Sequence, residues 1–333
     1  VDAGKAQDLA GNPNIASTSD DNAVVYDLST PLGAVDDVSV TTASPAGSSL
    51  WYSIVPERSG YLTVLAPSPA TGVALWDNRL DWLATAGVSG GTVRLDLPNA
   101  AAGQTYYLEL TGDAPVDLRV VNLVALSGAE STIFGTNGAD TFDFTSNRRF
   151  TIRGVTYDLA AQGATSFTFH GGPGDTAMLR GNSQAETANI YPLAADWTDG
   201  SASVTIDGAP QITFRGSGAN DTVNLYGRST AGVDKVVAYE TMVQMSRDDK
   251  SFTNSAYFAK NVTIDGRGGG LDDVYLHDTP QSETFTSVGG TTQWKWLDTA
   301  GDATNTFDIV GCYYVKAILA PGMSTRQGTQ TAT

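Results

Sequence analysis

Aspartate follows a glycine-rich corner in three similar stretches of the chain, and these carboxylates are the residues best suited to chemistry. The stretches span residues 169–181, 214–227 and 266–278, and their aspartates are Asp175, Asp221 and Asp272. Ca²⁺ takes roughly six to eight oxygen ligands, and glycine lets backbone carbonyls turn inward beside a carboxylate. The pattern therefore makes each corner a candidate calcium site.

Two further aspartates extend this set. Asp140 lies in a weaker copy at residues 134–142, and Asp273 directly follows Asp272. The competing interpretation is structural: glycine adopts positive φ at the corner, and the aspartate accepts hydrogen bonds from amides of its own turn. Because the corners are far apart in the sequence, the structural interpretation is favoured and calcium is the alternative.

Four tryptophans are the candidate ligand or partner surface. Trp294 and Trp296 alternate within one predicted strand, so both side chains share a face. Trp76 and Trp82 flank a predicted hairpin turn. Such aromatic faces stack on sugar rings or on another subunit. For Trp294 and Trp296, packing beneath an adjacent loop is the slightly favoured alternative.

No catalytic residue is predicted. His170 and His277 occupy different positions relative to the glycine corners, so they do not share a role. The sequence has no Gly-x-Ser-x-Gly elbow, no His-Glu-x-x-His motif and no phosphate-binding glycine loop. Acidic pairs such as Asp248–Asp249 suit a glycan-cleaving enzyme, a polysaccharide lyase or glycosidase, and this is the minority interpretation.

Composition limits the classes of partner. The chain of 333 residues has a formal net charge of −17, which disfavours nucleic acid and anionic membranes. Cys312 is the single cysteine, so no disulfide framework forms within the chain. No apolar run approaches the roughly 18 residues that span a bilayer. Abundant glycine and scarce lysine, together with a start at Val1, predict a processed or truncated, secreted or cell-surface protein.

Short apolar-alternating runs recur about every ten residues in the N-terminal third, which predicts an antiparallel sandwich of the jelly-roll kind. The runs are 50–55, 60–65, 73–76, 92–97, 105–110 and 116–121. Before them, residues 23–28 form a candidate strand in a polar stretch. That strand either lies on the following domain or is added to a neighbouring subunit.

The sandwich region resembles the bacterial pre-peptidase C-terminal domain. The residues that carry the resemblance are Trp51-Tyr52, Gly60–Val64, Ala74–Ala84 and Ala102–Leu110. The family implies a non-catalytic accessory module that sometimes binds calcium or matrix polymers. Leu50 stands where that family commonly has aspartate, so a ligand role at this position is not carried over.

Similar corners recur about every 50 residues after residue 127, which predicts a solenoid. Glu186, Asp234 and Glu283 begin the second strand of successive units, and each unit holds about four strand-like runs. We expect a right-handed parallel β-helix with about two coils per repeat, with a propeller as the alternative.

The repeats resemble the Gly/Asp-rich repeats of large bacterial cell-surface and extracellular proteins. Their corners also resemble the RTX nonapeptide, in which glycine-aspartate turns share calcium, although those repeats follow one another directly. The expected domains are an extension at 1–34, the sandwich at 35–126, the repeats at 127–320 and a tail or linker at 321–333.

Together these features predict an all-β, non-catalytic structural protein of the cell surface or extracellular matrix. Stacked repeats or the N-terminal strand would assemble it into a filament or surface layer, and calcium is the one cofactor considered. The alternative function is binding or cleavage of a cell-surface or matrix polysaccharide.

Overall fold

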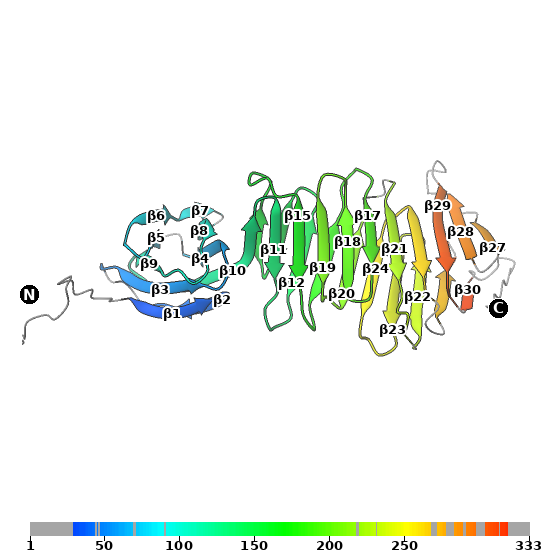
Figure 1. Cartoon of the computed structure of the whole chain (residues 1–333), viewed down its shortest axis with the longest axis horizontal. Coiled ribbons are helices and arrows are strands. Elements are labelled where there is room, and N and C mark those ends of the chain that lie inside the picture. Colours follow the sequence, from blue (N-terminus) through cyan, green and yellow to red (C-terminus); the bar gives the residue numbers. More distant parts are fainter. Residues whose placement is uncertain are drawn as a thin grey trace, which may run out of the picture.

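The structure is a computed structural model, and it describes residues 29–318 except 44, 46, 69–70, 90, 218–219, 231, 268–271, 278–282, 289–290, 298–303 and 313. The chain forms a β-sandwich followed by a β-solenoid of about four turns (Figure 1). Every regular element in this part of the chain is a strand. The described residues contain no helix that is long and apolar enough to cross a membrane. The all-β prediction is confirmed.

The sandwich strands are β1 (Thr30–Val35), β2 (Asp37–Thr41), β3 (Leu50–Pro56), β4 (Gly60–Ala66), β5 (Gly72–Trp76), β6 (Trp82–Thr85), β7 (Gly87–Ser89), β8 (Thr92–Ala100), β9 (Tyr106–Thr111) and β10 (Asp117–Ser127). One sheet has the order β1-β3-β9-β5-β6, and the other contains β10-β4-β8-β7 with β2 paired to β10. Alternate residues of both sheets point inward, as in β3 and β5, and they form one apolar core.

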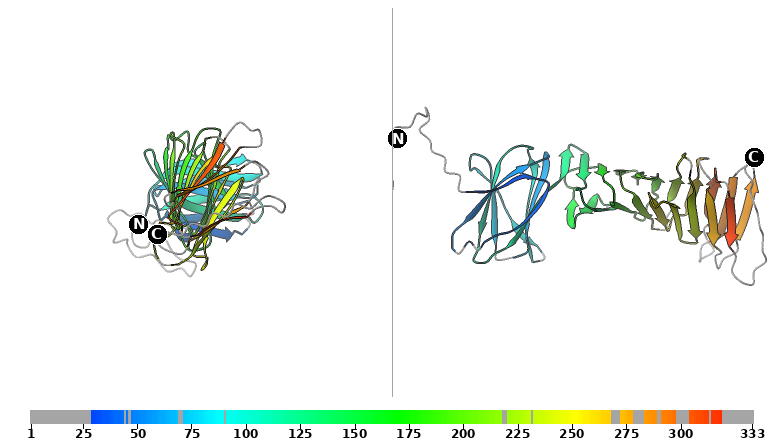
Figure 2. Two further views of the ribbon diagram at one scale, coloured as in Figure 1. Left: turned by 90° about the vertical axis from the view of Figure 1, so that its right-hand side faces the viewer. Right: turned by 90° about the horizontal axis from the view of Figure 1, so that it is seen from below.

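The solenoid strands are β11 (Glu130–Phe134), β12 (Thr141–Thr145), β13 (Arg149–Ile152), β14 (Val155–Asp158), β15 (Ser166–His170), β16 (Thr176–Arg180), β17 (Thr187–Ile190), β18 (Ala194–Thr198), β19 (Ser203–Asp207), β20 (Gln211–Arg215), β21 (Thr222–Tyr226), β22 (Asp234–Tyr239), β23 (Met242–Arg247), β24 (Thr253–Tyr257), β25 (Asn261–Asp265), β26 (Asp273–His277), β27 (Glu283–Val288), β28 (Thr291–Leu297), β29 (Thr304–Val310) and β30 (Tyr314–Ile318). They form two sheets that face each other across an apolar core. The views in Figure 2 show the strands stacked along one long axis, which excludes the propeller.

The repeating unit has five strands instead of the expected four. Each unit begins with a three-stranded antiparallel meander on one sheet, then places one strand on the opposite sheet and one back on the first. The meanders are β12–β14, β17–β19, β22–β24 and β27–β29, and successive meanders lie on opposite sheets. The coils are therefore parallel where single strands pair, as in β12–β16, and antiparallel within each meander.

Strand β10 belongs to both parts of the molecule. Its first half pairs with β2 and its last four residues pair with β11, while β4 lies along its other side. One sheet thus runs from the sandwich into the solenoid without a linker. Between the two halves, the fully buried Asn122 side chain donates to the carbonyls of Arg58 (3.1 Å) and Tyr61 (2.8 Å), and its Oδ1 accepts the Arg58 N–H (2.7 Å).

Ion pairs add a second connection between sandwich and solenoid. Arg153, in the β13–β14 turn, lies 2.9 Å from Asp37 of the sandwich and 3.3 Å from Asp140 of the solenoid. Arg119 also pairs with Asp37 at 2.8 Å. Burial alone would raise the pKa of Asp37, but the two guanidinium groups hold it below its usual value. The sandwich is therefore fixed against the first meander.

Candidate functional site

Six carboxylates at the corners of the solenoid are the most conspicuous polar groups in its core. Each side chain is at most 2% exposed. They are Asp140, Asp175, Glu186, Asp221, Asp234 and Asp272. A charged group costs free energy when it leaves water unless it is paired or hydrogen-bonded, so each must have a partner. Sequence reasoning proposed four of them as candidate ligands and took Glu186 and Asp234 only as register markers.

The partners of these carboxylates are backbone amides of their own corners. In five of the six corners, the residue that follows the corner glycine donates its N–H to the carboxylate. The donors are Thr136 to Asp140, Gly172 to Asp175, Asn182 to Glu186, Ser217 to Asp221 and Arg228 to Asp234. The carboxylates therefore cap the turns, as the structural interpretation of the corners requires.

The corner glycines leave the space that the carboxylates occupy. A Cβ built on Gly135 would lie 2.7 Å from Oδ2 of Asp175, and one on Gly227 would lie 2.8 Å from Oδ2 of Asp234. Such contacts are too short for real atoms. Glycine and carboxylate therefore recur together in the sequence because the carboxylate occupies the space that a side chain at the glycine position would need.

Corners of neighbouring coils stack into ladders with three levels. The first level is the residue that starts a meander, and its N–H donates to the aspartate of the second level. These bonds join Asp140 to Asp175 (2.7 Å), Glu186 to Asp221 (3.1 Å) and Asp234 to Asp272 (3.1 Å). Asp140 is therefore the equivalent of Glu186 and Asp234, not a weak copy of Asp175.

The third level of each ladder is a small residue. In the three ladders it is Ala209, Ala259 and Cys312, respectively. Ala164 is the equivalent residue after the first meander, and all four stand two residues before the strand that follows a meander. The residue before each of them has positive φ: Gly163, Gly208, Phe258 and Gly311. Cys312 is thus a buried substitute for alanine, and burial raises the pKa of its thiol to about 12.

The charge around the three ladders differs. Arg153 lies 3.3 Å from Oδ1 of Asp140, and Arg247 lies 3.6 Å from Oδ1 of Asp234. In the corresponding turn of the middle meander, Asp199 replaces the arginine. Burial, then the nearby Asp221, and also Asp199 raise the pKa of Glu186 to about 7. In the third ladder, burial and Asp234 raise the pKa of Asp272 to about 6.

The predicted calcium ligands are distributed over separate ladders. Asp140 and Asp175 share one ladder, whereas Asp221 and Asp272 belong to two others. Asp273 is outside the ladders, and its Oδ2 accepts the Tyr275 hydroxyl at 3.3 Å. Within the described residues, no three Asp, Glu, His or Cys side chains are grouped so that they could hold a metal ion.

The predicted aromatic pair lies inside the solenoid. Trp294 and Trp296 share a face as expected, but each is 2% exposed and both rings pack edge-on against Phe307. Their rings are therefore closed to a sugar at the surface. In the sandwich, Trp76 packs on Trp51 at 5.9 Å, whereas Trp82 on the edge strand β6 is 59% exposed.

The two histidines take part in stacks at strand ends. His170 lies between Phe134, with ring centroids 5.7 Å apart, and Asp207 at 3.3 Å, while His277 stacks on Tyr239 at 4.4 Å. These places differ in the unit, as the sequence indicated. Asp248 and Asp249 lie in the exposed β23–β24 turn, where the Ser251 N–H donates to Asp249.

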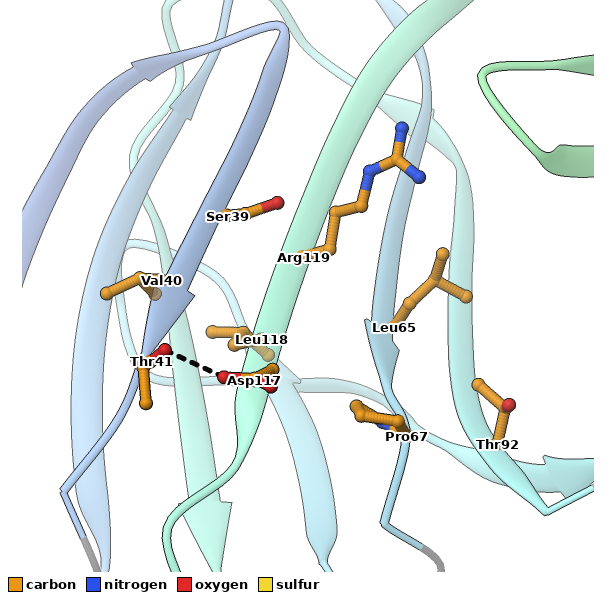
Figure 3. Close-up of a pocket in the computed structure, with 9 residues that line it drawn as sticks. All are labelled: Ser39, Val40, Thr41, Leu65, Pro67, Thr92, Asp117, Leu118 and Arg119. Carbon is orange, nitrogen blue, oxygen red and sulfur yellow. Dashed lines mark hydrogen bonds between the residues drawn. The ribbon is translucent and has the colours of Figure 1, made fainter.

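One open depression lies on the outer face of the sandwich (Figure 3). Its volume is about 390 Å³, and β2, β4, β8 and β10 contribute its lining, including Ser39, Leu65 and Arg119. Within its lining, the Thr41 hydroxyl of β2 donates to Asp117 on the neighbouring strand β10 at 2.7 Å. No histidine or cysteine lines it, and its charged lining residues are Asp117 and Arg119.

Comparison of the sequence with known protein families and with curated proteins finds no match. The resemblances to the pre-peptidase C-terminal domain and to Gly/Asp-rich surface repeats therefore stay predictions.

Proposed function

We propose that the chain is a non-catalytic structural protein of the cell surface or extracellular space, which assembles with copies of itself into a filament or surface layer. The observation that carries this proposal is the sheet shared through β10. It joins sandwich and solenoid by main-chain pairing, so the whole molecule acts as one stiff rod.

The distribution of polar groups supports a structural role. The most buried carboxylates cap backbone amides and hold the corners, so they are not presented to a substrate. The net charge of −17 makes side-by-side packing of rods unfavourable. Contacts at the rod ends through main-chain hydrogen bonds avoid much of this repulsion, and they generate open filaments when the two ends differ.

The test is the state of the purified chain. Negative-stain electron microscopy and light scattering over a range of concentrations, with and without calcium, should show polymers that lengthen with concentration. A chain that stays monomeric at the highest concentration in both conditions would overturn the proposal.

A further inference from the structure

The internal repeat assigns a definite partner strand to β27. In the three earlier units, the first strand of the meander pairs in parallel with the last single strand of its own unit: β12 with β16, β17 with β21, and β22 with β26. Strand β27 starts the fourth meander and pairs with β28, and no second partner occurs among the described strands. The fourth unit therefore has a place for one more parallel strand.

The packing of the β27 side chains also indicates that a neighbouring strand is missing at its outer edge. Phe285 points toward the core but remains partly exposed. Its equivalents in the earlier units are Phe142, Ala188 and Val236, and each of these is 0% exposed. In those units the additional strand provides the cover, through Ala177, Val223 and Val274.

The strand that fits this place has a recognisable sequence. The three existing strands follow an aspartate, and they place a small or branched apolar residue two and four positions after it. They read Asp175-Thr-Ala-Met-Leu, Asp221-Thr-Val-Asn-Leu and Asp272-Asp-Val-Tyr-Leu. The second and fourth residues after aspartate are buried, and the first and third face outward.

Residues 21–26 carry this pattern. They read Asp21-Asn22-Ala23-Val24-Val25-Tyr26, which parallels Asp221-Thr-Val-Asn-Leu-Tyr226 position by position. The same pattern also occurs at Asp36–Val40 and at Asp234–Ala238, but their strands are already paired, β2 with β10 and β22 with both β23 and β26. Residues 319–333 contain no Asp or Glu, so they do not supply the pattern.

We propose that residues 21–26 of one copy add to the outer edge of β27 of another copy and complete its fourth unit. Asp21 takes the corner position beside the start of β27 that Asp221 takes beside Glu186. Ala23 covers Phe285, while Val24 faces outward and Val25 faces inward beside Ser287. The proposal rests on the proposed function, because it specifies the contact by which the rods join.

The geometry requires the acceptor to be a second molecule. The C-terminal end of β1 lies at the junction, where Asn122 donates its N–H to the Asp36 carbonyl, so Thr30 lies at the far end of the sandwich. Figure 1 shows β1 and β27 at opposite ends of the rod. The ten strands stacked in one solenoid sheet span about 45 Å, whereas residues 27–29 bridge about 10 Å. A head-to-tail contact between copies follows.

A matched pair of substitutions tests the register in the full chain. Val25→Asn puts an amide at an inward position, while Val24→Asn copies the outward Asn224 of β21. We expect Val25→Asn and deletion of residues 1–28 to lose polymers in electron microscopy and light scattering, and Val24→Asn to retain them. Unchanged circular dichroism would show that each variant is folded.

A covalent test measures the contact itself. The register places Val24 beside Thr286, so the double variant Val24→Cys, Thr286→Cys should give a ladder of disulfide-linked chains on a non-reducing gel. The control Val25→Cys, Thr286→Cys points the two thiols to opposite faces and should give none.

The outcomes separate the two proposals. Wild-type chains that never polymerise would overturn the proposed function and this contact together. Wild-type polymers that persist in Val25→Asn and in the deletion, without the disulfide ladder, would overturn residues 21–26 as the added strand and leave self-assembly standing.

Discussion

At the scale of single residues, glycine and carboxylate at each corner act together. The glycine has no side chain, so the carboxylate can fold over the turn and accept the next N–H. This explains why the two residue types recur together without a metal ion having to be part of the corner. It also predicts different tolerance at two glycines of similar corners.

Gly135→Ala should destabilise the solenoid by about 2–4 kcal/mol, because its Cβ would lie 2.7 Å from Oδ2 of Asp175 and 3.3 Å from the His170 carbonyl. Gly172→Ala is the matched control, since no atom lies within 4 Å of its Cβ and its N–H remains. It should change stability by less than about 1 kcal/mol. Urea unfolding of both variants measures this, and equal losses would contradict the explanation.

Phe258 is the exception among the residues that precede the third level of the ladders. Its φ of 59° is in the left-handed region, where the equivalents are Gly163, Gly208 and Gly311. Left-handed backbone costs a non-glycine residue about 1–2 kcal/mol. Against this, the Arg215 guanidinium lies 5.5 Å from the Phe258 ring centroid and is worth about 0.5–1 kcal/mol.

Phe258→Gly should therefore leave stability unchanged or raise it by up to about 1 kcal/mol. Phe252→Gly is the contrasting variant, because Phe252 is 1% exposed and its loss should cost about 3–5 kcal/mol. Thermal unfolding by circular dichroism compares them. A large loss in Phe258→Gly would mean that the ring contributes more than the strained backbone costs.

At the scale of elements, the sequence predicted where strands lie better than how they pair. The apolar-alternating runs of the sandwich correspond to β3, β4, β5, β8, β9 and β10. The meanders were missed because their strands alternate like the coil strands, and the connection alone distinguishes them. A tight turn such as Arg153-Gly154 reverses the chain, whereas a glycine-to-aspartate corner carries it to the opposite sheet.

The signal that would have revealed the meanders lay in two positions. Asp140, Glu186, Asp234 and Glu283 mark their starts, and the small residues Ala164, Ala209, Ala259 and Cys312 mark their ends. The inward face of Trp294 and Trp296 could not be read from alternation, because a period of two residues shows that side chains share a face and not which face is buried. The predicted strand at 23–28 and the tail at 321–333 lie outside the described residues.

The junction strand β10 provides a prediction at this scale. Asn122→Ala would leave the Arg58 N–H and the Arg58 and Tyr61 carbonyls without their partners inside the protein. The free energy of unfolding should fall by about 2–4 kcal/mol, and the connection between sandwich and solenoid should be the part that is weakened. We expect the thermal transition to broaden or split in calorimetry, because the two parts no longer unfold together.

Asn147→Ala is the control for this variant, since Asn147 is exposed in the β12–β13 turn. This variant should change the free energy of unfolding by less than about 0.5 kcal/mol, and its thermal transition should stay single. A single transition in Asn122→Ala with the wild-type midpoint would show that the ion pairs of Asp37 hold the junction alone.

At the scale of the whole molecule, the buried ladders make stability depend on pH in an unusual direction. Glu186 has its pKa raised from 4.5 to about 7, and Asp272 from 3.8 to about 6, in both cases chiefly by burial. The folded chain thus holds more protons than the unfolded chain between about pH 4 and 7. Because stability falls with pH wherever the folded state binds more protons, the molecule should become less stable as pH rises through this window.

The opposite slope is expected in more acidic solution. Asp37 and Asp199 have pKa values below 3.8 despite the opposing effect of burial, because of the Arg119 and Arg153 contacts and the amides of residues 201–202, respectively. Their contribution is present above the unfolded pKa of about 4 and is lost as pH falls further. The melting temperature should therefore be highest near pH 4–5, which is lower than for most proteins.

Glu186→Gln removes the titration of Glu186, whose pKa is raised further than that of Asp272. Glutamine can still accept the Asn182 N–H through its carbonyl oxygen and has no proton to lose, so it imitates the protonated glutamic acid. We expect it to raise stability at pH 8 by on the order of 1–2 kcal/mol, to have little effect at pH 4.5, and to flatten the profile between them. Melting temperatures of both proteins across this range measure the difference. The opposite result would be a wild-type melting temperature that rises from pH 5 to pH 8 and does not change in Glu186→Gln. That result would show that Glu186 is ionised in the folded protein with little loss of stability.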